Sequence, residues 1–306
     1  LTGIDASEAL SMPGISAVWT TADIDIEPAG PANGMMNSAM LFPYLAIDTV
    51  RFVGDLVAIV VSEDKTSGTD AAETVIVDYE PLPVLLDMDE SVKNENLLHP
   101  AAESNIVLTF AAASNDDIFA DCEVVVDLTI ENQRVAPAPM EVRACVASWD
   151  GSRLTQWACS QGAHGARDGL AEILGIDKAN VRVITPDVGG GFGAKDHTIF
   201  PYYGVIASLF ATAPVRLANN RFEQFQSGLK RHPFSISSKL AFDKNTLKIK
   251  GFVSDIEVDG GGRENFSASV TSVGASASQG IYYIPRNDIQ AWCLPSHLPT
   301  AGSMRG

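Results

Sequence analysis

The sequence predicts an α+β fold divided into two domains, and three observations support this. The chain has 306 residues, which is more than one hydrophobic core normally needs. Hydrophobic residues make up 46% of it and charged residues 19%, a balance typical of globular proteins rather than disordered ones. Runs rich in β-branched residues alternate with segments of helical composition, and the sequence contains no internal repeat.

The first hundred residues predict a small α/β unit. Residues 57–61 are a short apolar run typical of a buried strand, and residues 62–73 have the composition of a capped helix. A second β-rich run, 75–79, is closed by two nearby prolines. This order predicts a tight βαβ or split βαβ unit. The polar segment 87–105 is expected to be a linker.

The rest of the chain predicts further strands and two helices. Asp150-Gly151 is the strongest hairpin signal, because this dipeptide favours a two-residue turn between strands. Gly175 is a typical helix stop, and Asp243-Lys244-Asn245 predicts a turn between two long strands. We therefore expect strands over 124–130, 144–149, 154–158, 181–184, 235–240 and 247–258, and helices over 167–174 and 198–211.

Charge and cysteine content exclude several classes of protein. The formal net charge of -17 repels phosphate backbones, so no nucleic acid partner is expected. The four cysteines are widely spaced, which predicts buried, reduced thiols and neither a zinc ribbon nor an iron–sulfur cluster on this chain. No segment reaches the roughly 18 apolar residues of a membrane span, and no signal peptide is evident, so we expect a cytoplasmic protein. Because it starts at Leu1 and stops at Gly306, directly after a Pro- and Gly-bearing stretch, the chain is expected to be a piece of a longer protein.

The most informative motif is the glycine loop Gly189-Gly190-Gly191-Phe192-Gly193, between a predicted strand and a predicted helix. Glycine lets another group approach the backbone closely, so several N–H groups are available to an anionic ligand. Ala194 and Lys195 follow where a P-loop requires Gly-Lys-Ser/Thr, and neither a dinucleotide fingerprint nor the companion kinase motifs are present. We interpret the loop as backbone pressed against a bulky anionic cofactor, with a flexible turn as the alternative.

A second feature is Gln161, at the junction of a predicted strand and a predicted helix. A glutamine amide donates hydrogen bonds without adding charge, which suits an uncharged contact to a ligand oxygen. Taken alone, a glutamine in such a place is more often a solvated loop residue. His164, three residues later, is interpreted as a helix-start or surface histidine rather than a ligand.

Four ordered motifs resemble the large subunits of the xanthine dehydrogenase and aldehyde oxidase family, the molybdenum hydroxylases. They cover residues 50–84, 133–141, 187–195 and 300–306. The first resembles the α/β hammerhead domain of that family, and the other three resemble its molybdopterin-binding domain. The resemblance implies a hammerhead domain over 1–97, followed over 98–306 by the first part of the molybdopterin-binding domain.

The resemblance also implies roles near the cofactor. Gln161 matches the glutamine whose amide contacts the apical oxo ligand of molybdenum, and Gly193 would offer its backbone N–H to the same ligand. Phe192 matches the aromatic residue beside the metal and the substrate, and Gly191 belongs to the same cofactor-binding loop. These roles make Gln161 and Phe192 candidate catalytic residues.

Three more positions follow from the resemblance. Asp196 is the third candidate catalytic residue: it falls where purine-oxidising members carry a glutamate that orients the substrate, so the shorter carboxylate argues against a purine. The backbone of Arg305 and Gly306 would lie near the pterin. Carbon monoxide dehydrogenases carry a cysteine where this chain has Gly306, which argues against carbon monoxide oxidation. Glu141 is interpreted as a structural carboxylate.

The implied cofactor is molybdenum–molybdopterin, with the cytosine dinucleotide as one possible form. The implied reaction oxidises an aldehyde or N-heteroaromatic carbon with oxygen derived from water, and 2Fe-2S and FAD centres on partner domains or subunits take the electrons. The family's glutamate base is expected beyond Gly306, so this fragment alone is not expected to turn over. The alternative is a non-catalytic or degenerate cofactor-binding or assembly module with the same fold.

Overall fold

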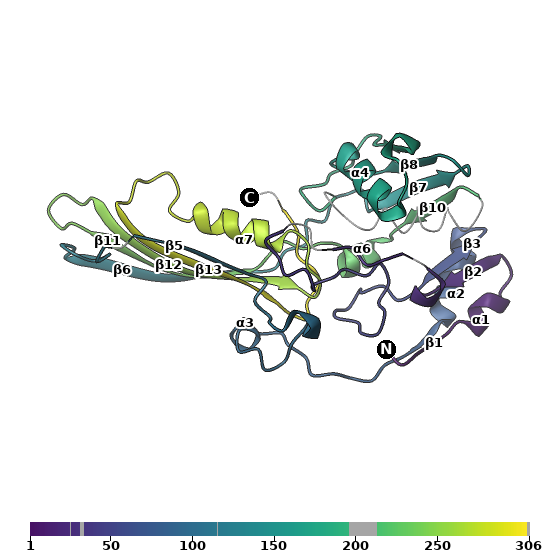
Figure 1. The fold of residues 1–306 in the computed structure, drawn as a ribbon, viewed down its shortest axis with the longest axis horizontal. Coiled ribbons are helices and arrows are strands. Elements are labelled where there is room, and N and C mark those ends of the chain that lie inside the picture. Colours follow the sequence, from purple (N-terminus) through teal and green to yellow (C-terminus); the bar gives the residue numbers. More distant parts are fainter. Residues whose placement is uncertain (25, 31–33, 115, 196–212, 305–306) are drawn as a thin grey trace.

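The computed structural model describes residues 1–24, 26–30, 34–114, 116–195 and 213–304. The molecule is elongated (Figure 1). A five-stranded sheet forms one end, while a four-stranded sheet and a small N-terminal unit form the other. The predicted helix over 198–211 lies outside the described residues.

The N-terminal unit contains two separate two-stranded sheets. Its elements are β1 (Gly3–Asp5), α1 (Ser7–Ser11), β2 (Ile15–Trp19), η1 (Thr21–Asp23), β3 (Ile59–Ser62), α2 (Lys65–Thr74) and β4 (Ile76–Asp78). β1 pairs with β4 and β2 with β3, both antiparallel. The predicted tight or split βαβ unit is therefore wrong, because the two N-terminal strands supply antiparallel partners and β3 and β4 belong to different sheets.

The segment 87–105, predicted to be a linker, contains short helices. It contains α3 (Met88–Ser91) and the short helix η2 (Pro100–Ala102). Ser91 is fully buried, and its hydroxyl donates to the Pro295 carbonyl at 2.9 Å. The buried Asn105 amide accepts from the Leu98 N–H at 2.9 Å. These two polar residues are packed and hydrogen-bonded, although most polar side chains of the segment are exposed.

The four-stranded sheet has the order β10 (Val215–Ala218), β7 (Ala144–Trp149), β8 (Leu154–Ala158), β9 (Val181–Ile184). The predicted hairpin at Asp150-Gly151 is confirmed, since β7 and β8 pair antiparallel on either side of it. α4 (Ala163–Leu174) packs Leu170 against Leu154 and Val181 of the sheet. It ends where predicted, at Gly175 with a φ of 62°, but begins four residues earlier than expected.

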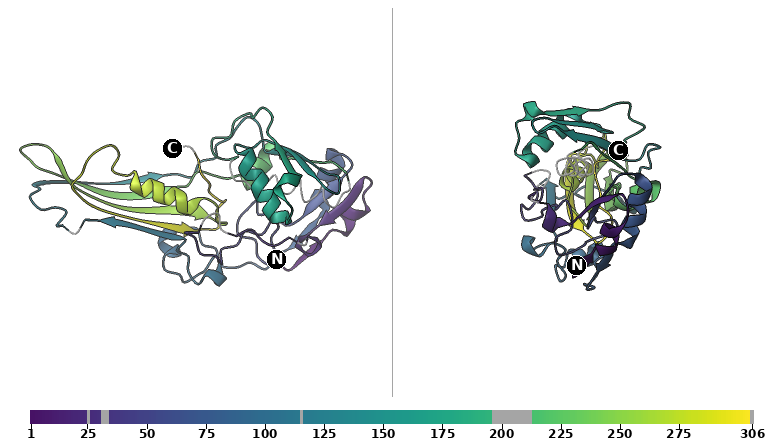
Figure 2. Two further views of the ribbon diagram at one scale, coloured as in Figure 1. Left: turned by 45° about the horizontal axis from the view of Figure 1, so that its top comes forward. Right: turned by 90° about the vertical axis from the view of Figure 1, so that its right-hand side faces the viewer.

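The five-stranded sheet has the order β5 (Leu108–Ala113), β13 (Arg286–Pro295), β12 (Ile249–Gly261), β11 (Phe234–Phe242), β6 (Val124–Asn132). β12 and β13 are parallel and are connected through α7 (Ser267–Ser276), which lies along one face of the sheet (Figure 2). Side chains alternate between the two faces, as expected for strands with one buried side. One apolar row crosses all five strands, through Ile130, Ile236, Ile256, Ala291 and Phe110.

Two short helices complete the described elements: η3 (Lys178–Asn180) and α6 (Arg221–Ser227). Each helix in the described ranges is too short or too polar to cross a bilayer. All four cysteines are free thiols, as predicted. Three of them are buried, whereas Cys122 is half-buried.

One buried ion pair connects the N-terminal region to the end of β12. Arg263 donates to the Asp55 carboxylate at 2.9 Å, and their side chains are 2% and 6% exposed. The Arg51 N–H also donates to Asp55, at 3.0 Å. This pair fixes the loop before β3 to the sheet that carries α7.

We expect Asp55→Asn to destabilise the protein by about 3–5 kcal/mol, because it leaves the Arg263 guanidinium buried without its counter-charge. Chemical denaturation of wild type and variant measures the loss. Asp168→Asn is the control, since the Asp168 side chain is 51% exposed in its pair with Arg167. Equal losses in the two variants would contradict this account.

Candidate functional site

The glycine loop follows β9, and its backbone adopts conformations that L-residues rarely adopt. Gly190, Phe192 and Gly193 have φ values of 97°, 56° and 93°. A positive φ is uncommon for a bulky residue and clusters at functional sites. The Phe192 ring turns back toward Gly190, but the residue stays 55% exposed. The loop therefore holds an aromatic side chain at the surface in a conformation that local preference disfavours.

Close contacts explain why the loop needs glycine. A Cβ on Gly193 would lie 1.7 Å from the Ser303 carbonyl oxygen, and one on Gly191 would lie 2.3 Å from Gln161 Oε1. A side chain at residue 193 would overlap the backbone, and one at residue 191 would displace the Gln161 amide. The structure thus brings together three segments that are far apart in sequence: residue 161, the glycine loop and residues 300–304.

Gln161 is oriented by the loop. Its Oε1 accepts from the Gly193 N–H at 2.8 Å and from the Lys195 N–H at 3.3 Å. The Gln161 backbone N–H donates in turn to the Lys195 carbonyl at 3.1 Å. Two backbone donors require an oxygen acceptor, which fixes the orientation of the amide and leaves its NH₂ group as the donor for another partner. The Gly193 N–H, expected to face a ligand, here donates to Gln161, and its role toward a cofactor stays a prediction.

Glu141 clamps both ends of the loop. Its Oε2 accepts from the Gly189 N–H at 2.9 Å and from Lys195 Nζ at 2.5 Å. The Glu141 N–H also donates to the Gly189 carbonyl, at 3.2 Å. The Lys195 side chain is 1% exposed, so its charge is desolvated and depends on this partner. These contacts give Glu141 the structural role that we interpreted from the sequence. The role of Lys195 as the partner of Glu141 was not predicted, although Lys195 closely follows the glycine loop.

Two buried cations lie beneath the converging segments. Arg143 donates to the Ala194 carbonyl, but its Nη1 is buried without a hydrogen-bond partner. The Lys230 carbonyl accepts from the Gly302 N–H at 2.9 Å. Burial lowers the pKa of Arg143 to about 10, and burial with two neighbouring arginines lowers the pKa of Lys230 to about 8. Neither residue forms an ion pair with another described residue. No sequence pattern identified these two residues.

The structure does not test every predicted site residue. Asp196, Arg305 and Gly306 lie outside the described residues. His164 is exposed in the first turn of α4, as interpreted from sequence. Within the described ranges, no group of three or more His, Cys, Asp or Glu side chains could hold a metal ion.

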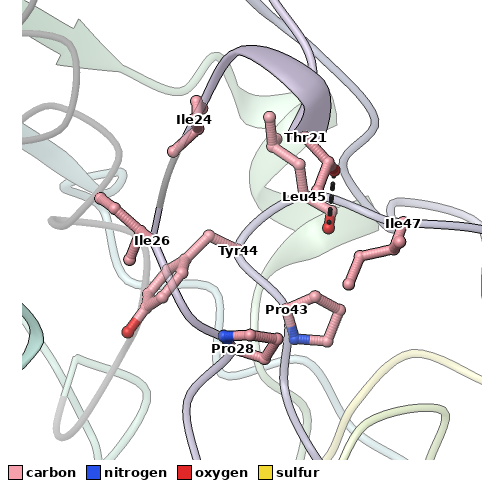
Figure 3. Close-up of a pocket in the computed structure, with 8 residues that line it drawn as sticks. All are labelled: Thr21, Ile24, Ile26, Pro28, Pro43, Tyr44, Leu45 and Ile47. Atoms are coloured by element: carbon pink, nitrogen blue, oxygen red, sulfur yellow. Dashed lines mark hydrogen bonds between the residues drawn. The ribbon is translucent and has the colours of Figure 1, made fainter.

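A small pocket lies away from these segments, in the loops after β2 (Figure 3). Its walls are mostly apolar, and the Thr21 hydroxyl donates to the Leu45 carbonyl at 3.3 Å. Eight residues line it: Thr21, Ile24, Ile26, Pro28, Pro43, Tyr44, Leu45 and Ile47. Because none of these side chains is charged, the pocket lacks the groups that an anionic ligand requires.

The glycine loop and its neighbours have the properties that an anionic cofactor needs. Gln161 is exposed, its NH₂ group is the donor of an amide whose oxygen is already bound, and the backbone can be approached closely at the glycines. Arg143 is buried against the Ala194 carbonyl at the end of the loop, and Lys230 adds a second buried positive charge near Arg143. The residues present therefore fit a bulky anionic group that lies over this loop.

We expect Glu141→Gln to destabilise the protein by about 1–3 kcal/mol, because Lys195 loses its counter-charge while Glu141 itself is partly solvated. Lys195→Met in the same chain should recover part of that loss, since no buried charge then remains. Thermal denaturation of both single variants and the double variant measures the coupling. If the losses of stability in the two single variants add up in the double variant, the Glu141 and Lys195 side chains do not stabilise each other.

Comparisons with known proteins agree with this arrangement. A family model described as "Molybdopterin cofactor-binding domain" matches residues 98–306, and one described as "Aldehyde oxidase and xanthine dehydrogenase, a/b hammerhead domain" matches residues 1–83. The large subunit of nicotine 6-hydroxylase from Paenarthrobacter nicotinovorans is 34% identical over 93% of this chain and 36% of its own. The carbon monoxide dehydrogenase large chain of Hydrogenophaga pseudoflava is 32% identical over 78% of this chain and 32% of its own.

A solved structure shows the same fold. Quinoline 2-oxidoreductase from Pseudomonas putida 86 superposes with a TM-score of 0.92 at 26% identity, over 100% of this chain and 40% of that one. The chain thus spans less than half the length of these relatives. It belongs to the aldehyde oxidase and xanthine dehydrogenase family, with an a/b hammerhead domain followed by a molybdopterin cofactor-binding domain.

Proposed function

We propose that this chain is part of the large subunit of a molybdenum hydroxylase that oxidises an aldehyde or N-heteroaromatic carbon. The observation that supports this most strongly is the convergence of Gln161, the glycine loop and residues 300–304 on one face. A generic turn needs neither a backbone contact that excludes every side chain nor an amide oriented by two N–H groups.

The described residues then take the following roles. Bound molybdenum–molybdopterin supplies the two-electron redox chemistry. Gln161 donates its NH₂ group to an acceptor on the cofactor, and the Gly193 contact with Ser303 shapes the backbone beneath it. Phe192 presents its exposed ring on the side where a planar substrate would stack. Arg143 and Lys230 favour the negative charge of the cofactor from below.

The names of two relatives support an N-heteroaromatic substrate. Nicotine and quinoline, named in two of them, are N-heteroaromatic compounds. Gly306 stands where carbon monoxide dehydrogenases carry a cysteine, and Asp196 is shorter than the glutamate of purine-oxidising members. We therefore favour an N-heterocycle or an aldehyde over carbon monoxide or a purine as the substrate. Iron–sulfur and FAD partners are the proposed electron acceptors.

The test uses the full-length subunit in its assembled complex. Metal and pterin analysis should find about one molybdenum and one pterin for each subunit, and it also identifies whether the cofactor is the cytosine dinucleotide form. A screen of N-heterocycles and aldehydes then identifies the substrate. A complete, folded complex without molybdenum would reject the enzyme and favour a non-catalytic module.

We expect Gln161→Ala to lower turnover about 100-fold in the full-length enzyme with little loss of stability, because an oriented donor is removed from a surface position. Gln161→Glu should be at least as slow, since a carboxylate cannot donate. Steady-state kinetics and thermal denaturation measure the two effects. Gln290→Ala, on β13 of the remote sheet, is the matched control, and wild-type turnover in Gln161→Ala would reject the assigned role.

A further inference from the structure

The position of α6 is not explained by the burial of apolar side chains. This helix has 7 residues, fewer than the roughly 12–15 that an isolated helix needs to be stable in water. Its aromatic residues Phe222 and Phe225 are 69% and 44% exposed, whereas the residue that it buries is Gln224, at 4%. The helix lies in the middle of the molecule (Figure 1). Specific contacts on its sides must therefore hold it in place.

On one side, α6 meets a loop of the N-terminal region, residues 50–55. Gly54 in this loop has a φ of 109°, and a Cβ there would lie 2.6 Å from the Gln226 carbonyl carbon. The same Cβ would lie 2.9 Å from the Ser227 nitrogen. Both atoms belong to the backbone of the last turn of α6, so neither can turn aside as the end of a flexible side chain could. The loop and the helix therefore meet at backbone distance.

The loop is itself anchored to the rest of the protein. Asp55 pairs with Arg263 at 2.9 Å and accepts from the Arg51 N–H at 3.0 Å. The Arg51 side chain donates through Nε to the Leu98 carbonyl at 3.0 Å. A Cβ on Gly262 would lie 3.2 Å from the Arg51 carbonyl oxygen, so the backbone is close here as well. The last turn of α6 thus rests against a loop that cannot easily give way.

On its other side, α6 holds residues 140–143. The buried Gln224 Oε1 accepts from the Arg143 backbone N–H at 3.0 Å. Arg221 Nη2 donates to the Met140 carbonyl at 2.8 Å. These two bonds connect the first and the last residue of the segment to the helix, so the position of the segment depends on the position of α6.

The same segment in turn holds both ends of the glycine loop. Glu141 accepts from the Gly189 N–H at 2.9 Å and from Lys195 Nζ at 2.5 Å. The Arg143 side chain, which is 3% exposed, donates to the Ala194 carbonyl. A shift of α6 is therefore transmitted through this segment to the glycine loop.

We propose that Gly54 is a positioning residue for the glycine loop and that it acts through α6. Because Gly54 has no side chain, the helix can approach residues 50–55 closely enough to hold residues 140–143 where the glycine loop requires them. A methyl group at residue 54 pushes the helix away from its place and weakens its bonds to the segment. This positioning is a property of the fold, and only its effect on catalysis rests on the proposed function.

Hydrogen exchange of the full-length complex tests this role, in peptides that span residues 140–143 and 189–195. We expect Gly54→Ala to lower the protection of both peptides about tenfold, the effect of losing one hydrogen bond. Gly14→Ala is the matched control, because Gly14 also has a positive φ, 78°, but the atom nearest to its added Cβ is Ser67 Oγ, at 3.5 Å. Unchanged protection in Gly54→Ala, or an equal loss in both variants, would overturn the proposal.

A matched pair of variants at Gln224 keeps the test decisive if Gly54→Ala fails to fold. Gln224→Met removes the acceptor for the Arg143 N–H at similar side-chain size, whereas Gln224→Glu keeps an oxygen there. We expect the protection of residues 189–195 to fall about tenfold in Gln224→Met and to stay near the wild-type value in Gln224→Glu. Equal protection in the two variants would count against the proposal.

A double variant separates positioning from a general loss of stability. If Gly54 acts through Gln224, adding Gly54→Ala to Gln224→Met should lower the protection of the glycine loop little further, because the connection is already broken. Additive losses would show that Gly54 acts by another route and would reject the proposal. Because exchange is read from the protein itself, these results are independent of whether molybdenum is found.

Discussion

The contact between Gly193 and the Ser303 carbonyl is the constraint on which the rest of the site depends. A Cβ at residue 193 would lie 1.7 Å from that oxygen, which is far inside any real contact distance. The glycine loop can meet residues 300–304 only because that Cβ is missing. The close approach fixes two backbone segments relative to each other, and the side chains around them maintain the arrangement.

The polar groups around this contact differ in how directly they bind the glycine loop. Gln161 and Glu141 bind the loop directly, through its N–H groups and through Lys195. Arg143 and Lys230 lie deeper, where burial makes an uncompensated positive charge costly. An anionic cofactor over the loop would offset part of that cost, which explains how a protein with a net charge of -17 can hold a negatively charged group.

Runs rich in β-branched and apolar residues, with turn signals between them, predicted most of the strands, because such residues favour extended backbone. Asp150-Gly151 and Gly175 located a hairpin and a helix end because their backbone conformations are locally determined. The pairing of β3 and β4 could not be predicted, since the partner strands near residues 3–5 and 15–19 are too short to produce a pattern. Sequence motifs identified the glycine loop and Gln161. The roles of Arg143, Lys195 and Lys230 depend on contacts between distant segments, so no local signal revealed them.

We propose that the backbone contact at Gly193 builds the cofactor site, and the molybdenum content of full-length Gly193→Ala tests this most directly. Gly151→Ala is the matched control, because Gly151 has nearly the same φ, 94° against 93°, but nothing within 4 Å of an added Cβ. The account predicts that Gly193→Ala assembles with less than about a tenth of the wild-type molybdenum, whereas Gly151→Ala retains it. Wild-type molybdenum in Gly193→Ala, or an equal loss in both variants, would contradict it.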